Sequence, residues 1–180
     1  MAGVLLVASA PVVALAALLV RLETHGHPIY RQHRVGRDEH GFEVYKLRTM
    51  VSGAEHMGAG MAVDAGDIRI TRIGALLRRT SIDELPNLVN VLRGEMAIVG
   101  PRPTLLAQVA DYTPHQRRRL EVKPGLTGWA QVKYRYGASI EDAMEKLRYD
   151  LYYIKHLSVF FDLTIVFDTV KVVLFGKGAV

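Results

Sequence analysis

The sequence contains no cysteine, and this absence removes several kinds of chemistry at once. Disulfide bonds, thiolate nucleophiles and zinc sites built from cysteine are all excluded. The chain also lacks any evident internal repeat or low-complexity tract, and it has a single tryptophan. Its 180 residues are enough for one domain with a real core and too few for two.

The charge balance is short of acidic residues, with 23 Lys and Arg against 18 Asp and Glu, a net charge of +5. Such a chain suits nucleic acid, an anionic lipid surface or phosphate-bearing substrates, and the balance alone does not choose among them. Apolar residues make up 49% of the chain and are concentrated at its two ends. This distribution indicates membrane contact rather than an unusually large core.

Residues 2–20 form an uncharged, mostly apolar run. As a helix it would be roughly 28 Å long, about one hydrocarbon thickness. A straight spanning anchor, a re-entrant helix and a cleaved signal peptide all fit this length, although no basic region precedes the run. Pro11 removes a helical hydrogen bond in the middle, and Ser9 could satisfy a freed carbonyl. The break favours a re-entrant helix that enters and leaves on one side.

Basic residues follow the apolar run directly, at Arg21, Arg31, Arg34 and Arg37. By the positive-inside tendency, this flank and the domain behind it lie in the cytoplasm. Residues 28–35 and 41–48 then read as two strands of a hairpin, with a turn at 38–41. Lys46 and Arg48 would share one face of the second strand, because side chains alternate with a period of two.

Two adjacent carboxylates, Asp83 and Glu84, lie in a strongly basic neighbourhood. The pattern of Ser81 followed by Glu84 predicts a capping box; alternatively, Pro86 is the first helical residue. Either way the acids lie at a helix start, where free N–H groups favour negative charge. On this local pattern alone, capping is the simpler interpretation. The helix should run through Leu92 and stop near residue 94.

The helix before these acids is predicted over residues 68–79, where apolar residues recur every three or four positions and Arg78 is on the polar face. After the acids, Arg102 stands between Pro101 and Pro103. Two prolines nearly fix its backbone, and one of their bonds could be cis. A guanidinium fixed in this way is suited to bidentate pairing with phosphate.

Two further helices are predicted near the C-terminus, over residues 139–154 and 159–175. The first is amphipathic. The second is strongly apolar, but Asp162, Asp168 and Lys171 make it a poor spanning helix. We expect it to lie partly in a membrane interface or to pack against the N-terminal helix.

Taken in order, these stretches resemble the bacterial sugar transferases, that is, the monotopic polyprenyl-phosphate phosphoglycosyl transferases. Each motif is weak alone, but together they cover nearly the whole chain in a specific order. Residues 134–139 look most like those of transferases that initiate exopolysaccharide synthesis. One departure is that the apolar run begins almost at Met1, whereas family members commonly have a basic residue and an Asp before it. The motifs that carry the resemblance are residues 31–36, 46–50, 67–74, 79–86, 99–103, 124–132 and 150–154.

The resemblance implies a mainly helical α+β fold and a membrane-associated monotopic domain. Residues 1–22 would be a re-entrant membrane helix, broken at Ser9 and Pro11. Residues 23–180 would be a cytoplasmic, membrane-surface catalytic domain with a small β-hairpin and interfacial amphipathic helices. The implied location is the bacterial inner membrane, with the catalytic domain on its cytoplasmic face.

The implied reaction transfers a sugar-1-phosphate from a nucleoside diphosphate sugar, a UDP-sugar by inference, to polyprenyl (undecaprenyl) phosphate. Asp83 would be the nucleophile that forms an aspartyl phosphosugar, releasing UMP. Glu84 would assist proton transfer or position the acceptor, and both acids would hold Mg²⁺. The predicted phosphate-binding residues are Arg102, Arg78, Lys46 and Arg48, with Pro101 and Pro103 framing the first of them.

The implied partners are the nucleotide sugar, the polyprenyl phosphate and inner-membrane lipids, with no nucleic acid; a homo-oligomer is left open. Two other classes of protein fit parts of the sequence. A basic nucleic-acid-binding membrane protein fits the charge, but no recognition motif is present. A catalytically inactive membrane-bound scaffold fits the apolar ends.

Overall fold

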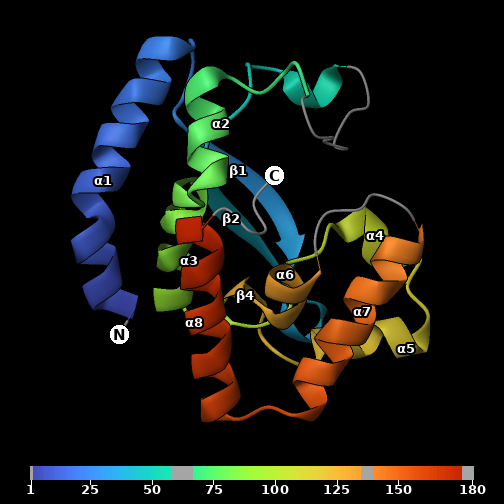
Figure 1. Ribbon diagram of the computed structural model, residues 1–180. Coiled ribbons are helices and arrows are strands. Elements are labelled where there is room, and N and C mark those ends of the chain that lie inside the picture. The colour runs from blue at the N-terminus through green and yellow to red at the C-terminus, as the bar shows by residue number, and fades with distance from the viewer. Residues whose placement is uncertain (1, 58–66, 135–139, 176–180) are drawn as a thin grey trace.

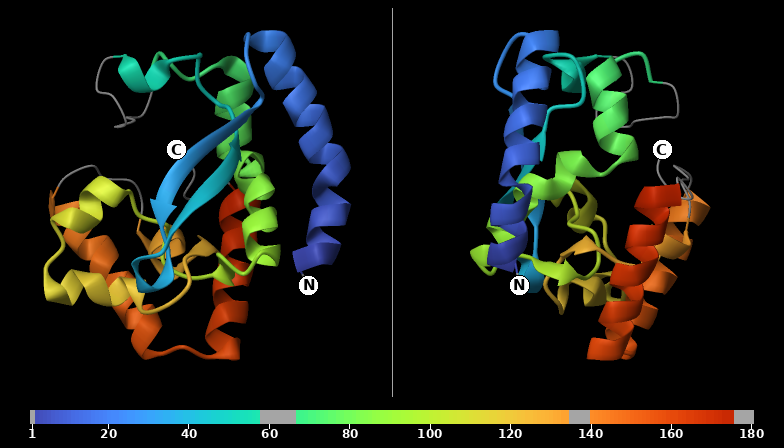
Figure 2. Two further views of the ribbon diagram at one scale, coloured as in Figure 1. Left: turned by 180° about the vertical axis from the view of Figure 1, so that it is seen from behind. Right: turned by 60° about the vertical axis from the view of Figure 1, so that its left-hand side comes forward.

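The computed structural model describes residues 2–57, 67–134 and 140–175, and it is mainly helical. Figures 1 and 2 show a β-hairpin through the middle, with α1 to α3 on one side of it and α4 to α7 on the other. The α-helices are α1 (Ala2–Glu23), α2 (Arg72–Arg79), α3 (Leu88–Leu92), α4 (Leu106–Ala110), α5 (Pro114–Arg117), α6 (Trp129–Lys133), α7 (Ile140–Lys155) and α8 (Val159–Phe175). The strands are β1 (Ile29–Val35), β2 (Gly41–Leu47), β3 (Ala97–Val99) and β4 (Gly125–Thr127), and the 3₁₀ helices are η1 (Arg37–Glu39), η2 (Ala54–His56), η3 (Ile82–Asn87) and η4 (Arg118–Leu120).

The hairpin prediction is confirmed, since β1 and β2 pair antiparallel across a turn formed by η1. Both faces of the hairpin contribute buried side chains. Phe42 and Val44 pack with Met96 on one face, while Leu47 packs on the other. Strands buried on both faces lose a clean alternation of polar and apolar residues, which explains the imperfect pattern in this stretch.

Two asparagine side chains attach η3 and α3 to the outer edge of β2. Asn87 accepts a hydrogen bond from the Tyr45 backbone N–H at 2.8 Å, and Asn90 donates to the Glu43 carbonyl at 2.6 Å. Unpaired edge groups of a strand need such partners. These bonds fix the segment that carries the two acids against the strand that carries Lys46.

Helix α1 is one continuous helix, so the predicted break at Ser9 and Pro11 is not observed. The helix instead bends about its midpoint (Figure 1). Pro11 lacks the N–H of one helical hydrogen bond, and the Ser9 hydroxyl donates to the Leu6 carbonyl at 3.2 Å. One missing bond therefore bends the helix without ending it. α1 is also the one described helix that is long and apolar enough to cross a membrane.

Both ends of α1 contact the same folded body. Ala16 and Val20 pack with Leu47 and Leu77 of β2 and α2. At the end of α1, the Glu23 carboxylate accepts from the Ile73 N–H at 3.1 Å. At its start, Gly3 lies against Leu92 of α3. The helix therefore lies alongside the domain over its whole length instead of projecting from it.

Helix α2 begins four residues later than predicted, because Thr71 acts as its N-cap and accepts from the Gly74 N–H at 2.9 Å. Arg69, expected on an exposed face, is buried and pairs with Asp67 at 2.6 Å. Gly74 allows close packing, since a Cβ there would lie 2.0 Å from the Thr49 carbonyl oxygen. α2 is thereby held directly against the chain that leaves β2.

The segment with the two acids is a 3₁₀ helix with both acids in its first turn, as expected, but neither the predicted capping box nor a start at Pro86 is observed. Ser81 adopts a left-handed conformation with φ 54° and makes no side-chain cap. Pro86 lies inside η3, and the α-helical part begins only at Leu88. A capping Ser needs an extended backbone to reach the N3 amide, and the left-handed turn at Ser81 removes that geometry. The predicted stop is confirmed, since α3 ends just before Gly94, with φ 78°.

A second small sheet pairs β3 with β4 in parallel. No cis peptide bond occurs among the described residues, so the bonds to Pro101 and Pro103 are trans. α7 and α8 are confirmed, although residue 139, where the first of them was predicted to begin, lies outside the described residues. α8 buries Ile165 against Val99 of β3 and Tyr153 of α7. It packs mainly on β3, β4 and α6, whereas α1 packs on α2, η3 and α3.

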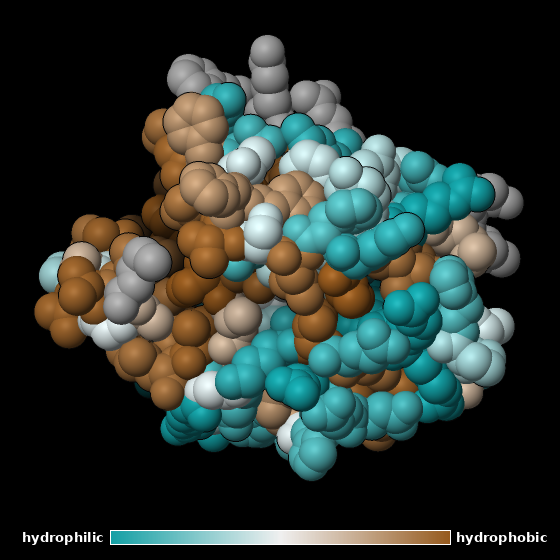
Figure 3. Space-filling view, turned by 90° about the horizontal axis from the view of Figure 1, so that it is seen from below, coloured by the Kyte–Doolittle hydropathy of each residue, from teal (hydrophilic) through white to brown (hydrophobic). Residues whose placement is uncertain are grey.

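An apolar face extends over α1 and α8, with α3 between them. Figure 3 shows apolar side chains gathered on that side of the molecule and polar side chains over the other. Phe160 is the most exposed of its large side chains in α8, at 84%. We define the apolar face by its exposed side chains: Val4, Leu5, Val7, Val12, Leu15, Leu18, Leu19, Leu22, Leu92, Val159, Phe160, Leu163, Phe167, Val170 and Leu174.

Candidate active site

A broad cleft of about 1900 Å³ lies between the hairpin with α2 and η3 on one side and α6 to α8 on the other. Its walls bring together residues that are far apart in the sequence. It is lined by both acids, by all four predicted phosphate-binding residues and by one of the two framing prolines: Asp83, Glu84, Lys46, Arg48, Arg78, Arg102 and Pro103. Pro101, the remaining one, is buried beside the cleft.

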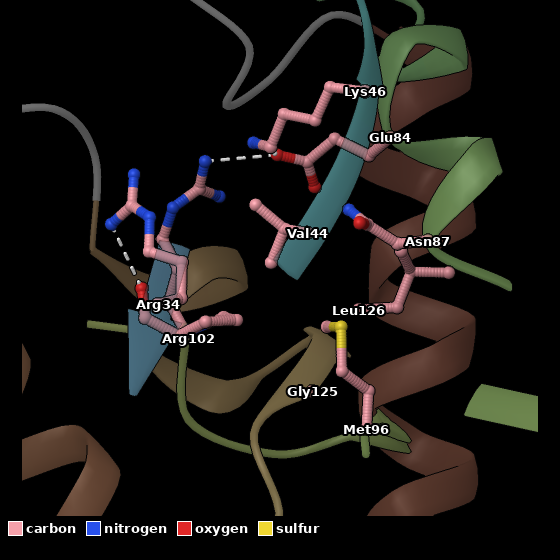
Figure 4. A pocket seen from close by; sticks show the side chains of 10 residues that line it. Arg34, Val44, Lys46, Glu84, Asn87, Met96, Arg102, Gly125 and Leu126 are labelled. Carbon is pink, nitrogen blue, oxygen red and sulfur yellow. Dashed lines mark hydrogen bonds and ion pairs between the residues drawn. The ribbon is translucent and has the colours of Figure 1, made fainter. Parts of the chain in front are cut away.

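Two cations converge on Glu84 (Figure 4). Lys46 Nζ and Arg102 NH2 lie 2.6 Å and 2.9 Å from the same carboxylate oxygen, Oε1. Burial disfavours the charged form of Glu84, but the two cations outweigh burial and lower its pKa to about 2. Burial likewise lowers the pKa of Lys46, with the charge of Arg102 as the next cause. Glu84 is therefore a fixed anion that holds two cations at the cleft wall.

Asp83 differs from Glu84 both in its hydrogen-bond partners and in the direction of its pKa shift. It is only 8% exposed, and none of the described residues donates a hydrogen bond to its carboxylate. Burial, together with the adjacent charge of Glu84, raises the pKa of Asp83 to about 6, against the lowering effect of Lys46, Arg78 and Arg102. A carboxylate without donors retains its lone pairs for a substrate or a metal ion. The two neighbouring acids thus have different chemical capacities.

The remaining predicted cations are held at the rim of the same cleft. Arg78, at the end of α2, donates to the Thr49 hydroxyl at 2.8 Å and lies near enough to lower the pKa of Asp83. Arg48 does not share the position of Lys46, because it follows the last residue of β2. It donates instead to the Thr24 carbonyl and hydroxyl, at 2.9 Å and 2.8 Å, beside the end of α1.

Arg34 belongs to this site and was not among the predicted site residues. The hairpin register pairs Tyr30 with Lys46 and Arg34 with Phe42, which puts Arg34 on the Lys46 face. Its NH1 donates to the Pro103 carbonyl at 3.1 Å. Burial and the nearby Arg102 lower the pKa of Arg34 to about 10. The period-two alternation could have identified it once the register was known, but the register depends on the turn.

The arginine run at 117–119 is bound to carboxylates in every case. Arg117 pairs with Glu39, Arg118 with Glu121 at 3.3 Å, and Arg119 with Asp150 at 2.7 Å. Figure 4 shows that the cations drawn in the pocket, Arg34, Lys46 and Arg102, come from the hairpin and from the loop of residues 101–104, called the Arg102 loop. The strongest basic run in the sequence is therefore mainly structural.

Mg²⁺ is the predicted metal, and the donors partly fit it. The described residues include no cluster of three or more His, Asp or Glu that could hold a metal by themselves. Mg²⁺ commonly binds through one or two carboxylates together with substrate phosphates and water. Asp83 offers a carboxylate free of protein donors, and the adjacent Glu84 can add a second oxygen. The fit therefore depends on phosphate oxygens completing the site.

Comparison with known proteins identifies the family to which the chain is similar. The description "Bacterial sugar transferase" belongs to the family whose sequence model matches residues 1–176. A UDP-N-acetylgalactosamine-undecaprenyl-phosphate N-acetylgalactosaminephosphotransferase of Aeromonas hydrophila is 42% identical over 172 residues, which cover 94% of this chain and 40% of that protein. A UDP-glucose:undecaprenyl-phosphate glucose-1-phosphate transferase of Escherichia coli is 41% identical over 184 residues, covering 99% and 39%.

An uncharacterized sugar transferase of Bacillus subtilis is 40% identical over 174 residues, covering 97% of this chain and 83% of that protein. The match to the family extends over nearly the whole chain and includes the segments that form the cleft. The chain belongs to the bacterial sugar transferase family. It spans about two fifths of the length of the Aeromonas and Escherichia relatives.

Proposed function

We propose that this protein transfers a sugar-1-phosphate from a nucleoside diphosphate sugar, a UDP-sugar, to undecaprenyl phosphate. The observation that carries the proposal is the contrast between Asp83, which is buried and has no donor among the described residues, and Glu84, which is held by Lys46 and Arg102. The family relatives name both substrate classes in their own reactions. The named relatives differ in the sugar, so the proposal leaves the sugar open.

The reaction proceeds in two displacements. In the first, an Asp83 carboxylate oxygen attacks the phosphorus next to the sugar, and an O–P bond forms. The diphosphate P–O bond breaks, and UMP leaves with its electron pair. In the second, an oxygen of undecaprenyl phosphate attacks the same phosphorus, and the bond to Asp83 breaks. The carboxylate is regenerated, so two easier transfers replace one hard transfer.

The cleft cations counter the negative charge of both substrates. Arg102 and Lys46 lie beside Glu84, and Arg78 lies near Asp83, so positive charge is already in position before substrate arrives. Preorganised charge of this kind stabilises a phosphoryl transition state without further rearrangement. Asp83, with Glu84 in support, would hold Mg²⁺, which would offset phosphate charge when bound.

The apolar face would rest on the cytoplasmic leaflet of the inner membrane, where initiation of exopolysaccharide synthesis begins. α1 contacts the domain at both ends, at Gly3 and at Glu23. A helix that crossed the membrane alone would have lipid, and not the domain, around its far end. The packing of α1 therefore supports a monotopic, re-entrant arrangement in which both ends stay on one side.

The Asp83→Asn variant tests the reaction. We expect turnover to fall by about 10³-fold or more, because an amide cannot form the covalent bond. After incubation with UDP-sugar alone, mass spectrometry should find the phosphosugar on the wild-type protein and not on the variant. Asn is nearly isosteric with Asp, so membrane association should be unchanged. Phosphosugar retained on the variant would refute Asp83 as the nucleophile.

Labelling of a cysteine at position 3 tests the topology. The chain has no native cysteine, so Gly3→Cys introduces a unique thiol. In intact cells, a membrane-impermeant maleimide added from outside should not react, whereas it should react after the cells are opened. A matched Thr24→Cys variant, at the other end of α1, should behave in the same way. Labelling of position 3 from outside would contradict the re-entrant arrangement.

A further inference from the structure

We propose that Arg119 and Asp150 are positioning residues for the reaction: together they hold the backbone of Arg102, so that its guanidinium stays against Glu84. The inference rests on the proposed function. It concerns a buried ion pair at the far side of the Arg102 loop, which contributes no group to the reacting atoms.

The ion pair joins two elements that are remote from η3. Asp150 lies in α7 and is 3% exposed, and Arg119 lies in η4 with its NH2 2.7 Å from Asp150 Oδ2. Burial raises the pKa of Asp150 to about 6 even though Arg119 opposes this rise. A single buried pair of this type is weak evidence for stability, because desolvation offsets much of the attraction. Its contacts therefore need another explanation.

The same Arg119 nitrogen reaches the Arg102 loop. Arg119 NH2 donates to the Arg102 carbonyl at 3.2 Å. Arg119 NH1 donates to the Tyr112 hydroxyl at 3.0 Å, and Tyr112 in turn donates to the Thr104 hydroxyl at 3.4 Å. The guanidinium thus has its terminal nitrogens engaged by α7, by the loop and by Tyr112, and these contacts fix its plane.

The loop has unusual need of such a donor. Pro101 and Pro103 have no backbone N–H, so the loop is held mainly through its carbonyls. Each carbonyl from 101 to 104 has a donor. The donors are the Gly125 N–H to residue 101 at 2.8 Å, Arg119 to residue 102, Arg34 to residue 103 at 3.1 Å, and the Val35 N–H to residue 104 at 2.9 Å. Within residues 101–104, Arg102 is the residue whose side chain reaches Glu84, and Arg119 donates to its carbonyl.

The neighbouring arginines show that this arrangement is specific to position 119. Arg117 and Arg118 pair with Glu39 and Glu121, and the side chains of both pairs are well exposed. The pair of Arg119 with Asp150 is buried and adjoins the cleft. Arg119 lines the cleft, and its terminal nitrogens are bonded to Asp150, Tyr112 and the Arg102 carbonyl, so the role that we assign to it acts through Arg102.

A double-mutant cycle tests the proposal. Asp150→Asn removes the charge that fixes Arg119 but keeps the shape of the side chain. We expect kcat/KM for UMP release to fall about tenfold to a hundredfold, since small misplacements of a charged group have effects of this size. In the Arg102→Ala background the same change should lower kcat/KM by less than about twofold, because the residue it positions is absent.

Arg119→Lys provides a second variant. Lysine keeps a charge for Asp150 but has no fork to reach the Arg102 carbonyl at the same time. It should lower kcat/KM in wild type and not in Arg102→Ala. Arg117→Ala, in the same arginine run, and Asp168→Asn, which removes the partner of Lys133 at 2.9 Å, are matched controls and should stay within about twofold.

The outcomes separate the two proposals. Equal losses in both backgrounds, together with a lowered unfolding temperature, would overturn the positioning role and leave the proposed function intact. Absence of UMP release from the wild-type protein would instead reject the proposed function. A readout independent of turnover is hydrogen exchange at the Arg102 and Thr104 amides. It should be faster in Asp150→Asn than in Asp168→Asn, and equal rates would count against the proposal.

Discussion

Two carboxylates, the half-buried Glu84 and the buried Asp150, lie on opposite sides of Arg102 and have opposite electrostatic behaviour. Glu84 contacts two cations, Lys46 and Arg102, and its pKa falls to about 2. Asp150 contacts one, Arg119, and its pKa rises to about 6. Burial acts in the same direction on both, so the number of cations decides the result.

The difference separates a reactive centre from its support. Around Glu84, an excess of positive charge is held at the cleft, next to an acid without donors, and this suits anionic substrates. Among the described residues, Asp150 is paired with Arg119 alone. The other hydrogen bonds of Arg119 go to the Arg102 carbonyl and the Tyr112 hydroxyl. Arg102 connects the two regions. Its guanidinium pairs with Glu84, and its carbonyl accepts a hydrogen bond from Arg119, which pairs with Asp150.

The largest expected loss of stability comes from displacing the loop of residues 101–104, which lies between Glu84 and Asp150. A Cβ added at Gly125 would lie 2.1 Å from the Gly100 nitrogen and 2.3 Å from the Thr127 oxygen, so the backbone must move. Gly125→Ala should lower the free energy of unfolding by about 3 kcal/mol or more, as overpacking against backbone does. Chemical denaturation in detergent measures this loss.

Gly41→Ala is the matched control, because its Cβ would meet only the Arg34 carbonyl oxygen at 4.0 Å. It should change the unfolding free energy by less than about 1 kcal/mol. Similar losses in both variants would mean that the close approach at Gly125 is not what holds the loop in place.

A smaller effect is expected from Glu84→Gln, measured in the Asp83→Asn background so that the neighbouring acid does not titrate. Neutralising Glu84 leaves Lys46 and Arg102 as adjacent like charges. Above about pH 5, the free energy of unfolding should fall by about 2 kcal/mol, at the low end for a buried pair because Arg102 is half exposed.

The free energies of unfolding of the Glu84 and Asp150 variants, each relative to its parent protein, should depend on pH in opposite directions. The pKa of Glu84 is about 2 in the folded chain, below its ordinary value of 4.5. Its stabilisation is therefore present above about pH 4.5 and is lost as the pH falls toward 2. The pKa of Asp150 is instead raised from 3.8 to about 6, so wild type should lose stability relative to Asp150→Asn as the pH rises through that window. Slopes of the same sign would contradict the comparison.

Much of this arrangement was predictable from local patterns. The hairpin and the helices at the C-terminal end follow from alternation and spacing. The two flanking prolines singled out Arg102, whereas the roles of Asp83 and Glu84 were implied by the family resemblance, because their local pattern favoured capping. Other features depend on tertiary structure. The capping-box pattern at Ser81 failed because one left-handed residue changed the path of the chain.

Burial and pairing were likewise invisible in the sequence. Arg119 looked like one of three equivalent arginines until α7 brought Asp150 to it. Arg34 looked like part of a basic flank until the register placed it beside Lys46. Helix α1 bends at Pro11 without breaking, because one missing hydrogen bond is too little to end a helix that packs along its length.

The last turn of α1 is tied to α2 through Glu23 and to the end of β2 through Thr24 and Arg48. These hydrogen bonds fix the position of α1 relative to the residues that line the cleft. Whatever layer holds α1, the height and tilt of the cleft above that layer are set by two hydrogen-bonded joints rather than by a free linker. Each residue of helical rise is about 1.5 Å, so adding or removing one residue in α1 would shift the start of the helix relative to Asp83 by about that distance.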